Sequence, residues 1–180
     1  MNKNLFKTFA IAAMAVLAGA CAKEQVGSAD GETVEMTFNV DVPGVEVSTK
    51  GLSDAASVNE LICQVFLNDG NYTPVPDLNQ TVTVTDKHAK VTFNLVKGQK
   101  YAFIFWAQTK GTGYYNTEDL RSVKMNVDAV KANDPAMDAF WATDTKTVTA
   151  KASSYSKPLY RALAQVNFGQ VGLDRQDNLP

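Results

Sequence analysis

The segment from Thr33 to Val42 alternates strictly between apolar and polar side chains, and this pattern constrains the fold more than any other feature of the chain. Its apolar positions are Val34, Met36, Phe38, Val40 and Val42. A period of two places successive side chains on opposite faces of a strand, and it leaves a helix without a continuous apolar stripe. The segment is therefore predicted to be a β-strand with one buried face, ended by Pro43 and Gly44.

Several later segments have the length and apolar content of short strands. They comprise residues 61–67, 80–85, 91–95, 100–108, 120–127, 147–151 and 159–168, with a short apolar island at residues 140–142. Residues 61–67 and 100–108 carry large apolar side chains on both faces, which is typical of strands in the interior of a sandwich. The polar turn at residues 85–88 is expected to join its two neighbours as a hairpin. About eight short strands separated by turn residues predict an all-β antiparallel sandwich.

The N-terminal end has the three-part pattern of a secretory signal. Lys3 and Lys7 precede an apolar run at residues 9–20 that ends in small residues. The run is far shorter than the roughly 20 apolar residues that cross a bilayer as a helix. We therefore expect a cleaved signal peptide over residues 1–20.

The residues that follow indicate the kind of signal. Residues 17–21, Leu-Ala-Gly-Ala-Cys, resemble the lipobox of bacterial lipoproteins, in which the cysteine is acylated and becomes the new N-terminus. We expect acylation of Cys21, for example with palmitate, attachment to the membrane through the lipid alone, and a flexible tether over residues 21–31. A plain secreted protein cut near Ala20 is the alternative.

The composition excludes several classes of function. The chain has 17 Lys and Arg against 19 Asp and Glu, a formal net charge of -2, so it lacks the basic excess that a nucleic-acid partner needs. One histidine, His88, and two cysteines are too few for a zinc site or a disulfide framework. No phosphate-binding glycine loop, nucleophile elbow or H-E-x-x-H motif occurs. We therefore expect no catalytic residues, no metal and no cofactor, with Cys63 as a small buried hydrophobe and His88 in a solvated turn.

Four aromatic residues are candidates for a sugar-stacking platform, since exposed rings beside polar loops suit carbohydrates. They are Trp106, Tyr114, Tyr115 and Trp141. Most of these rings are expected in the core, but Tyr114 and Tyr115 lie between Gly113 and Asn116 and are predicted to be exposed. These two tyrosines are therefore the candidate glycan contacts.

Several motifs occur along the chain in an order that resembles a known family. They are LAGAC at 17–21 followed by Lys23 and Glu24, TVEMTFNVDVP at 33–43, STKGLSD at 48–54, LICQVFLNDG at 61–70, YAFIFWAQ at 101–108, MDAFWA at 137–142 and LYRALAQVNFG at 159–169. With these motifs the chain resembles, over most of residues 15–170, the fimbrillin family. This family comprises the lipoprotein-type major pilins and fimbrillin-like surface lipoproteins of Gram-negative anaerobes.

The resemblance implies a transthyretin-like β-sandwich of about seven to eight strands that builds fibres by strand exchange. In that family a trypsin-like protease cuts behind the first strand, and the groove that opens accepts a strand from the next subunit. The matching bond here joins Lys50 to Gly51, and the strand that would leave comprises residues 32–42. The groove-filling side chains of that strand would be Val34, Met36, Phe38 and Val40.

The same resemblance implies a location and a set of partners. Other pilus subunits would bind by donor-strand insertion, and the protein would be an outer-membrane lipoprotein at the cell surface or in a fimbrium. An anchor or accessory protein whose first strand stays in place is the alternative reading of the loop around Lys50.

Near its C-terminal end the sequence departs from the pattern of the fimbrillin family. Family pilins continue through a second sandwich domain that supplies the donor strand, whereas this chain ends in an irregular stretch at residues 173–180. We therefore expect one fimbrillin-like N-terminal domain over residues 32–172, as a single-domain accessory form or a shortened reading frame. Two hypotheses follow: a structural or adhesive component of surface fimbriae, and a surface lipoprotein that binds glycan through exposed aromatics.

Overall fold

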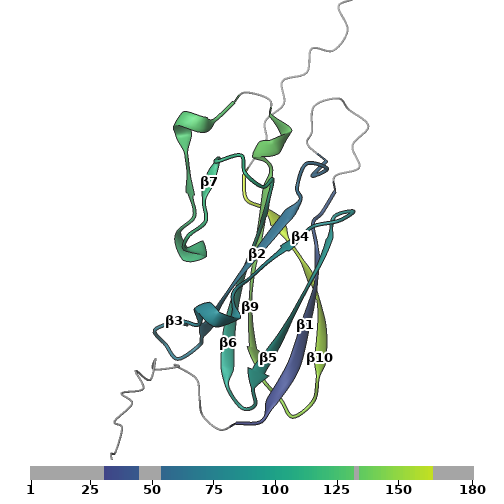
Figure 1. Cartoon of the computed structure of the whole chain (residues 1–180), viewed down its shortest axis with the longest axis vertical. Helices are drawn as coiled ribbons and strands as arrows, with labels where there is room; N and C mark the ends of the chain where they lie inside the picture. Colours follow the sequence, from purple (N-terminus) through teal and green to yellow (C-terminus); the bar gives the residue numbers. More distant parts are fainter. Residues whose placement is uncertain (1–30, 45–53, 132–133, 164–180) are drawn as a thin grey trace, which may run out of the picture.

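Seven strands of four or more residues form a two-layer β-sandwich in the computed structural model, which describes residues 31–44, 54–131 and 134–163 (Figure 1). Four two-residue strands and four short 3-10 helices complete the regular structure of these ranges. The all-β sandwich predicted from the alternating segments is confirmed.

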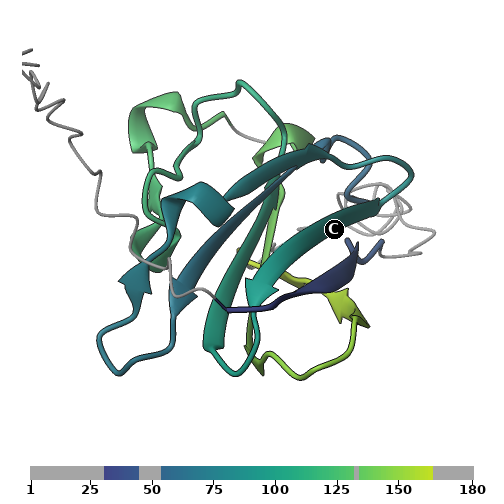
Figure 2. The ribbon, with the colours of Figure 1, turned by 60° about the horizontal axis from the view of Figure 1, so that its bottom comes forward.

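One layer is a three-stranded sheet with the order β10-β1-β5. Its strands are β1 (Thr33–Asp41), β5 (His88–Val96) and β10 (Ser153–Pro158). Figure 2 shows β1, in purple, between β10, in yellow, and β5, in teal. β1 pairs antiparallel with β5 but parallel with β10, so the predicted antiparallel arrangement has one parallel exception among the described strand pairs. The first described strand thus occupies the centre of its sheet.

The other layer is a six-stranded sheet in which β11, β9, β6 and β2 follow one another, and both β3 and β4 pair with β2. Its strands are β2 (Glu60–Leu67), β3 (Thr73–Pro74), β4 (Gln80–Thr83), β6 (Lys100–Gln108), β9 (Ala139–Thr147) and β11 (Tyr160–Arg161). β2 and β6 are interior strands, as the apolar residues on both of their faces predict. Pro74 restricts β3 to a two-residue pairing at the edge, because proline has no amide hydrogen for a ladder.

Between β6 and β9 the chain crosses the outer face of the six-stranded sheet, and we call residues 109–131 and 134–138 the excursion (green in Figure 1). Its elements are β7 (Tyr115–Asn116), η2 (Leu120–Ser122), β8 (Lys124–Met125), η3 (Val127–Ala129) and η4 (Pro135–Met137), while η1 (Pro76–Leu78) lies between β3 and β4. The strand predicted at residues 120–127 is therefore wrong except for the two residues of β8. The side chain of Asp119 accepts a hydrogen bond from the Arg121 amide and starts a 3-10 turn where an extended strand was expected.

The main core lies between the two sheets and is built from the inward faces of their strands. β1 contributes Val34, Met36, Phe38 and Val40, which are 8, 2, 0 and 1% exposed. Burial of each such side chain contributes about 1.5–3 kcal/mol to folding. A second, smaller cluster covers the outer face of the six-stranded sheet, where Trp106, Leu120 and Ala139 are buried. The sandwich therefore has a central core and an outer one, and β6 takes part in both.

Two predicted connections differ from the structure. The turn at residues 85–88 is present, but its flanking segments pair only through the single bridge between Thr85 and His88. β4 then joins β2, and β5 joins β1 in the opposite layer, so the expected hairpin is a crossover between sheets. β10 was not predicted, and the strand expected at residues 159–168 is described only as far as Leu163, with β11 at its start.

Candidate functional site

β1 fills a slot between β5 and β10. All nine residues of β1 pair with β5, and six of them pair with β10. Side chains add to these ladders, since the hydroxyls of Thr37 and Thr92 lie 3.0 Å apart and Asn39 Nδ2 donates to Ser154 Oγ at 3.0 Å. The slot therefore holds β1 by two backbone ladders at once.

Phe38 is the centre of the aromatic packing in this slot. Its ring centroid lies 4.8 Å from that of Phe103, 5.2 Å from Phe105, 5.6 Å from Tyr155 and 6.2 Å from Phe93. These rings come from β5, β6 and β10, so both sheets contribute walls to the pocket. Edge and tilted ring contacts add to the gain from burial. A strand without a large apolar side chain at this position would leave a cavity between the sheets.

An ionic group ties β10 to the opposite sheet, and we call Asp144, Lys146 and Lys157 the edge latch. The carboxylate of Asp144 lies 3.1 Å from Lys146 Nζ and 3.3 Å from Lys157 Nζ. Burial alone would raise the pKa of Asp144, but hydrogen bonds from Lys146, the Thr145 amide and Lys157 outweigh it and lower that pKa below its usual range. Lys146 Nζ also lies 4.4 Å from the ring centroid of Tyr155. β10 is thus held by contacts that do not involve β1.

The structure describes some of the residues predicted to take part in strand exchange and not others. The four predicted groove-filling side chains of β1 all face the main core. Cys21, Lys50 and Gly51, the predicted acylation and cleavage positions, lie outside the described residues.

A second region of interest is the outer face of the six-stranded sheet, where the excursion is fastened by Gln64. The Gln64 amide donates to the Glu118 carbonyl at 2.8 Å and accepts from the Leu120 amide at 2.9 Å. The guanidinium of Arg121 lies 5.1 Å from the ring centroid of Phe66 on the same face. The excursion is therefore packed against the sheet and forms fixed walls beside it.

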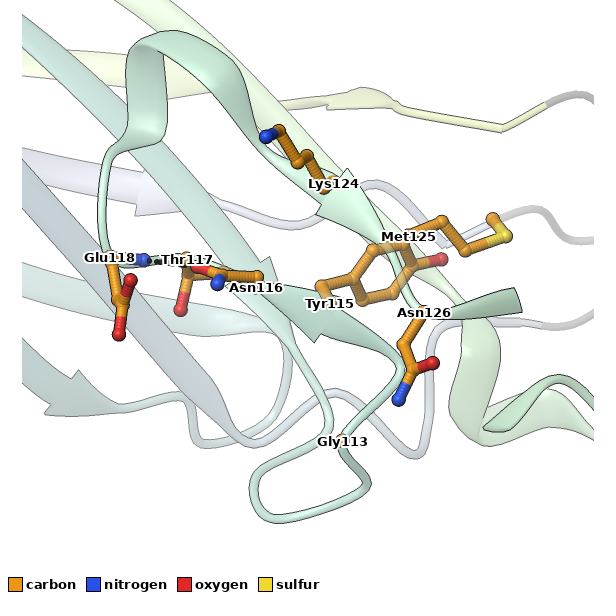
Figure 3. Close-up of a pocket in the computed structure, with 8 residues that line it drawn as sticks. All are labelled: Gly113, Tyr115, Asn116, Thr117, Glu118, Lys124, Met125 and Asn126. Carbon is orange, nitrogen blue, oxygen red and sulfur yellow. Dashed lines mark hydrogen bonds between the residues drawn. The ribbon is translucent and has the colours of Figure 1, made fainter. Parts of the chain in front are cut away.

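Two adjoining hollows lie on this side of the molecule, one between the excursion and the sheet and the other within the excursion. The apolar hollow, of about 300 Å³, is lined by Ile104, Trp106, Leu120, Val123, Trp141 and Ala162. The polar hollow, of about 550 Å³, is lined by Asn116, Thr117, Glu118, Lys124 and Asn126. Tyr115 and Met125 line both, so the hollows adjoin each other at these two side chains. Figure 3 shows the ring of Tyr115 beside Met125, with Glu118 at one end of the polar hollow and Asn126 at the other.

The two tyrosines predicted as glycan contacts occupy different environments. Tyr114 is only 3% exposed, which corrects the expectation that it is exposed, and its hydroxyl donates to the carboxylate of Asp134. That hydrogen bond raises the pKa of Tyr114 and lowers the pKa of Asp134. Tyr115 is half-buried, and its hydroxyl donates a hydrogen bond to the Met137 carbonyl. Burial raises the pKa of Tyr115 to about 12. Of this pair, only Tyr115 borders the hollows.

One of the two tryptophans is more exposed than expected. Trp106 is 7% exposed, as predicted for a core ring, but Trp141 is 45% exposed. Tyr160, which is 64% exposed, pairs with Trp141 across β9 and β11. The sequence alternation around Tyr160 was visible, but only the strand register shows that these two rings are neighbours.

Cys63 and His88 are two described residues whose side chains could act as a nucleophile or a general base. Cys63 is buried, as predicted, and burial raises the pKa of its thiol. His88 is exposed in its turn, with Nδ1 2.7 Å from Asp41 Oδ1. Across residues 31–44, 54–131 and 134–163, no three His, Cys, Asp or Glu side chains are grouped so that they could hold a metal ion. No helix within these ranges has the length and apolar character needed to cross a membrane.

Several solved structures are similar to the chain at low identity. A candidate polysaccharide-binding protein (DUF1812) of Bacteroides thetaiotaomicron VPI-5482 is 13% identical with a TM-score of 0.45, over 71% of this chain and 47% of that one. A fimbrial assembly protein of Parabacteroides distasonis ATCC 8503 is 9% identical with a TM-score of 0.36, over 72% and 53%. A pilus-presented adhesin, Cpa, is 14% identical with a TM-score of 0.26, over 74% and 28%. The chain spans about half the length of the first two proteins.

Sequence comparison gives the family. None of the curated proteins matches the sequence. The family of unknown function DUF6562 matches residues 26–176, and this range contains every strand described above. The fimbrillin resemblance stays a prediction, because the matching family carries no functional name. On the extent of its match, the chain belongs to DUF6562, a family of unknown function.

Proposed function

We propose that this protein is a structural component of surface fimbriae that assembles by exchange of β1 for a strand of a neighbouring subunit. The observation that carries the proposal is the place of β1. It is the first described strand of the sequence, yet it fills the centre of the three-stranded sheet between two strands from later in the chain. Its departure would leave a slot walled by β5 and β10 and open to a strand from another molecule.

The free energies involved favour replacement of β1 over simple loss. Met36, Phe38 and Val40 together bury enough apolar surface to contribute several kcal/mol, at about 1.5–3 kcal/mol each. A domain with a net stability of about 5–15 kcal/mol would barely survive an empty slot. An incoming strand restores both the backbone ladders and the packing, which is the logic of strand addition to a sheet.

The slot also defines what the incoming strand must look like. It would run antiparallel to β5 and parallel to β10, as β1 does. Its alternate side chains would be apolar, with a large ring or branched chain at the position of Phe38 between the aromatic walls. The edge latch supports the proposal, because it holds β10 in place while β1 is absent.

Cleavage at the bond between Lys50 and Gly51 would free β1, and acylated Cys21 would hold the uncut protein at the outer membrane. This export route, the domain over residues 32–172 and the partners are part of the proposal. Radiolabelled palmitate incorporation that disappears in Cys21→Ser tests the acylation. Equal label in both proteins would remove the lipoprotein step.

The test of exchange uses protein cut by trypsin and a fluorescent peptide with the sequence of residues 32–42. We expect the cut protein to release its own first strand and take up the peptide, which fluorescence anisotropy measures. Lys50→Gln, which trypsin cannot cut at this position, is the matched control and should take up none. A peptide carrying Phe38→Asp should also fail to bind.

A disulfide lock separates exchange from loose surface binding. The hydroxyls of Thr37 and Thr92 lie 3.0 Å apart on adjacent strands. Replacing both residues by cysteine therefore places two thiols close enough to form a disulfide. The oxidised form should block peptide uptake after cleavage, and reduction of the same sample should restore it. Uptake that is equal in oxidised and reduced protein, or absent from the cut protein altogether, would overturn the proposal.

A further inference from the structure

A row of aromatic side chains crosses the outer face of the six-stranded sheet. In the strand register Ile62 lies opposite Trp106, Trp106 opposite Trp141, and Trp141 opposite Tyr160. Directly opposed residues of neighbouring strands point to the same face with their Cβ atoms about 5 Å apart. Exposure rises along the row, from 7% at Trp106 to 45% at Trp141 and 64% at Tyr160. The row therefore ends in two adjacent rings that are accessible to a ligand.

The inner end of the row continues into the apolar hollow. Trp106 and Trp141 line this hollow, and the ring of Tyr115 closes it, with its centroid 5.1 Å from that of Trp106 at an angle of 69°. The ring of Tyr115 is fixed, since its hydroxyl donates to the Met137 carbonyl. The exposed platform thus leads into a preformed cavity of the volume that suits a small ligand or one unit of a polymer, roughly 300 Å³ or more.

The adjoining polar hollow supplies hydrogen-bonding groups. The side chains of Glu118, Lys124 and Asn126 make no hydrogen bond or ion pair with another residue in the described part of the chain. Glu118 and Lys124 carry opposite charges, so this rim has donors and acceptors but no net charge. Such a rim is complementary to a neutral ligand with many hydroxyl groups, because its two charges balance.

We propose that Trp141, Tyr160 and the two hollows form a binding site for a neutral saccharide. Sugar rings have apolar C–H faces that stack on aromatic rings and hydroxyl edges that bond to polar side chains, so one ligand matches both parts of the site. An apolar protein segment would cover the platform, but it would leave the polar groups beside it without partners. The site lies on the opposite layer from β1, and this inference does not rest on the proposed strand exchange.

The test is native affinity electrophoresis of the full chain in gels that contain laminarin, yeast mannan or dextran, with polygalacturonate as the anionic comparison. We expect at least one of the neutral polysaccharides to retard the protein and polygalacturonate to have no effect. Trp141→Ala and Tyr160→Ala should each weaken the retardation constant by about tenfold, and Tyr160→Phe should retain it because the ring remains. Tyr72→Ala is the matched control, since Tyr72 is 47% exposed beside β3, at the other edge of the same sheet.

Folding of each variant is checked by its urea midpoint, so that loss of binding is separated from loss of structure. Acrylamide quenching gives a second readout, because a bound saccharide should shield the exposed Trp141 while the buried Trp106 changes little. No retardation by any neutral polysaccharide would overturn the proposal, as would equal retardation of Trp141→Ala and the unmodified chain. Self-association in sedimentation that Trp141→Ala abolishes, without retardation, would assign this face to a protein contact instead.

Discussion

β1 and β6 are both nine-residue strands with a partner on each side, but they differ in how many faces they bury. β6 is covered on both faces, since Phe103 and Phe105 lie in the main core and Trp106 lies beneath the excursion. β1 buries its inward face, whereas on its outward face Glu35 and Asn39 are exposed and only the polar Thr37 is buried. A strand with one buried face can leave without disturbing a second core, whereas removal of β6 would destroy both.

The largest expected effect compares one phenylalanine from each strand. Phe103→Ala and Phe38→Ala should each lower the free energy of unfolding by about 3–5 kcal/mol, because both rings are 0% exposed. In protein cut after Lys50, the peptide of residues 32–42 should restore the stability of Phe38→Ala, since it supplies a new Phe38. The same peptide should leave Phe103→Ala destabilised, and urea unfolding measures both. Restoration of both variants, or of neither, would contradict the distinction between the two strands.

The next largest loss of stability is expected from removing the ion pair that fixes β11, a strand of the same sheet as β6. Arg161 Nη1 lies 2.9 Å from Asp138 Oδ1, and the Asp138 side chain is 7% exposed. Asp138→Ala should lower the free energy of unfolding by about 2–3 kcal/mol, somewhat less than for a fully buried pair because Arg161 is partly solvated. Glu32→Ala is the control, since the side chains of its ion pair with Lys97 are 66% and 42% exposed and the change should alter stability by less than about 1 kcal/mol. Equal effects of the two substitutions in urea unfolding would show that β11 is not fixed by this pair.

A smaller effect is expected within the excursion that covers β6. Tyr114→Phe removes the hydrogen bond to Asp134 but keeps the buried ring, so it should cost about 1 kcal/mol. Tyr72→Phe, which alters an exposed hydroxyl, should cost less than about 0.5 kcal/mol. Thermal unfolding of both variants checks the difference. No loss in Tyr114→Phe would mean that the excursion is held by its apolar contacts alone.

The smallest effect is the pH dependence of the edge latch. The pKa of Asp144 is lower in the folded protein than in the unfolded chain, so its stabilisation is complete above the unfolded pKa and is lost as the pH falls through the folded value. The difference in stability between the unmodified chain and Asp144→Asn should therefore be largest near pH 7 and should shrink below about pH 4. Urea unfolding at a series of pH values measures it. A difference that stays constant on acidification would show that the carboxylate charge does not contribute.

The strands with strong side-chain patterns were predictable from sequence. β1, β2 and β6 each combine large apolar side chains with a turn at one end, and the interior places of β2 and β6 follow from the apolar residues on both of their faces. β10 was missed because the tyrosine of Ser153–Pro158 is its only large apolar side chain, and its pairing with β1 and the edge latch hold it in place. The turn at residues 85–88 gives a reversal of the chain but does not determine which strand each arm joins.

The candidate sites were predictable in part, for a similar reason. The inward face of β1 was visible as an alternation, but its central place depends on β10. Tyr114 was expected outside because of its polar neighbours, yet its hydroxyl finds Asp134 and the ring is buried. Trp141 and Tyr160 lie 19 positions apart in the sequence, and only the register of β9 and β11 brings them together.

Hydrogen exchange with mass spectrometry, before and after the Lys50 bond is cut, tests the central claim most directly. The account predicts that the amides of β1 exchange about tenfold faster or more after cleavage, while those of β6 keep their protection. Lys50→Gln treated with the same protease should show no change in β1. Protection of β1 that remains equal to that of β6 after cleavage, or loss of protection in both strands together, would contradict the account that β1 is a separable strand.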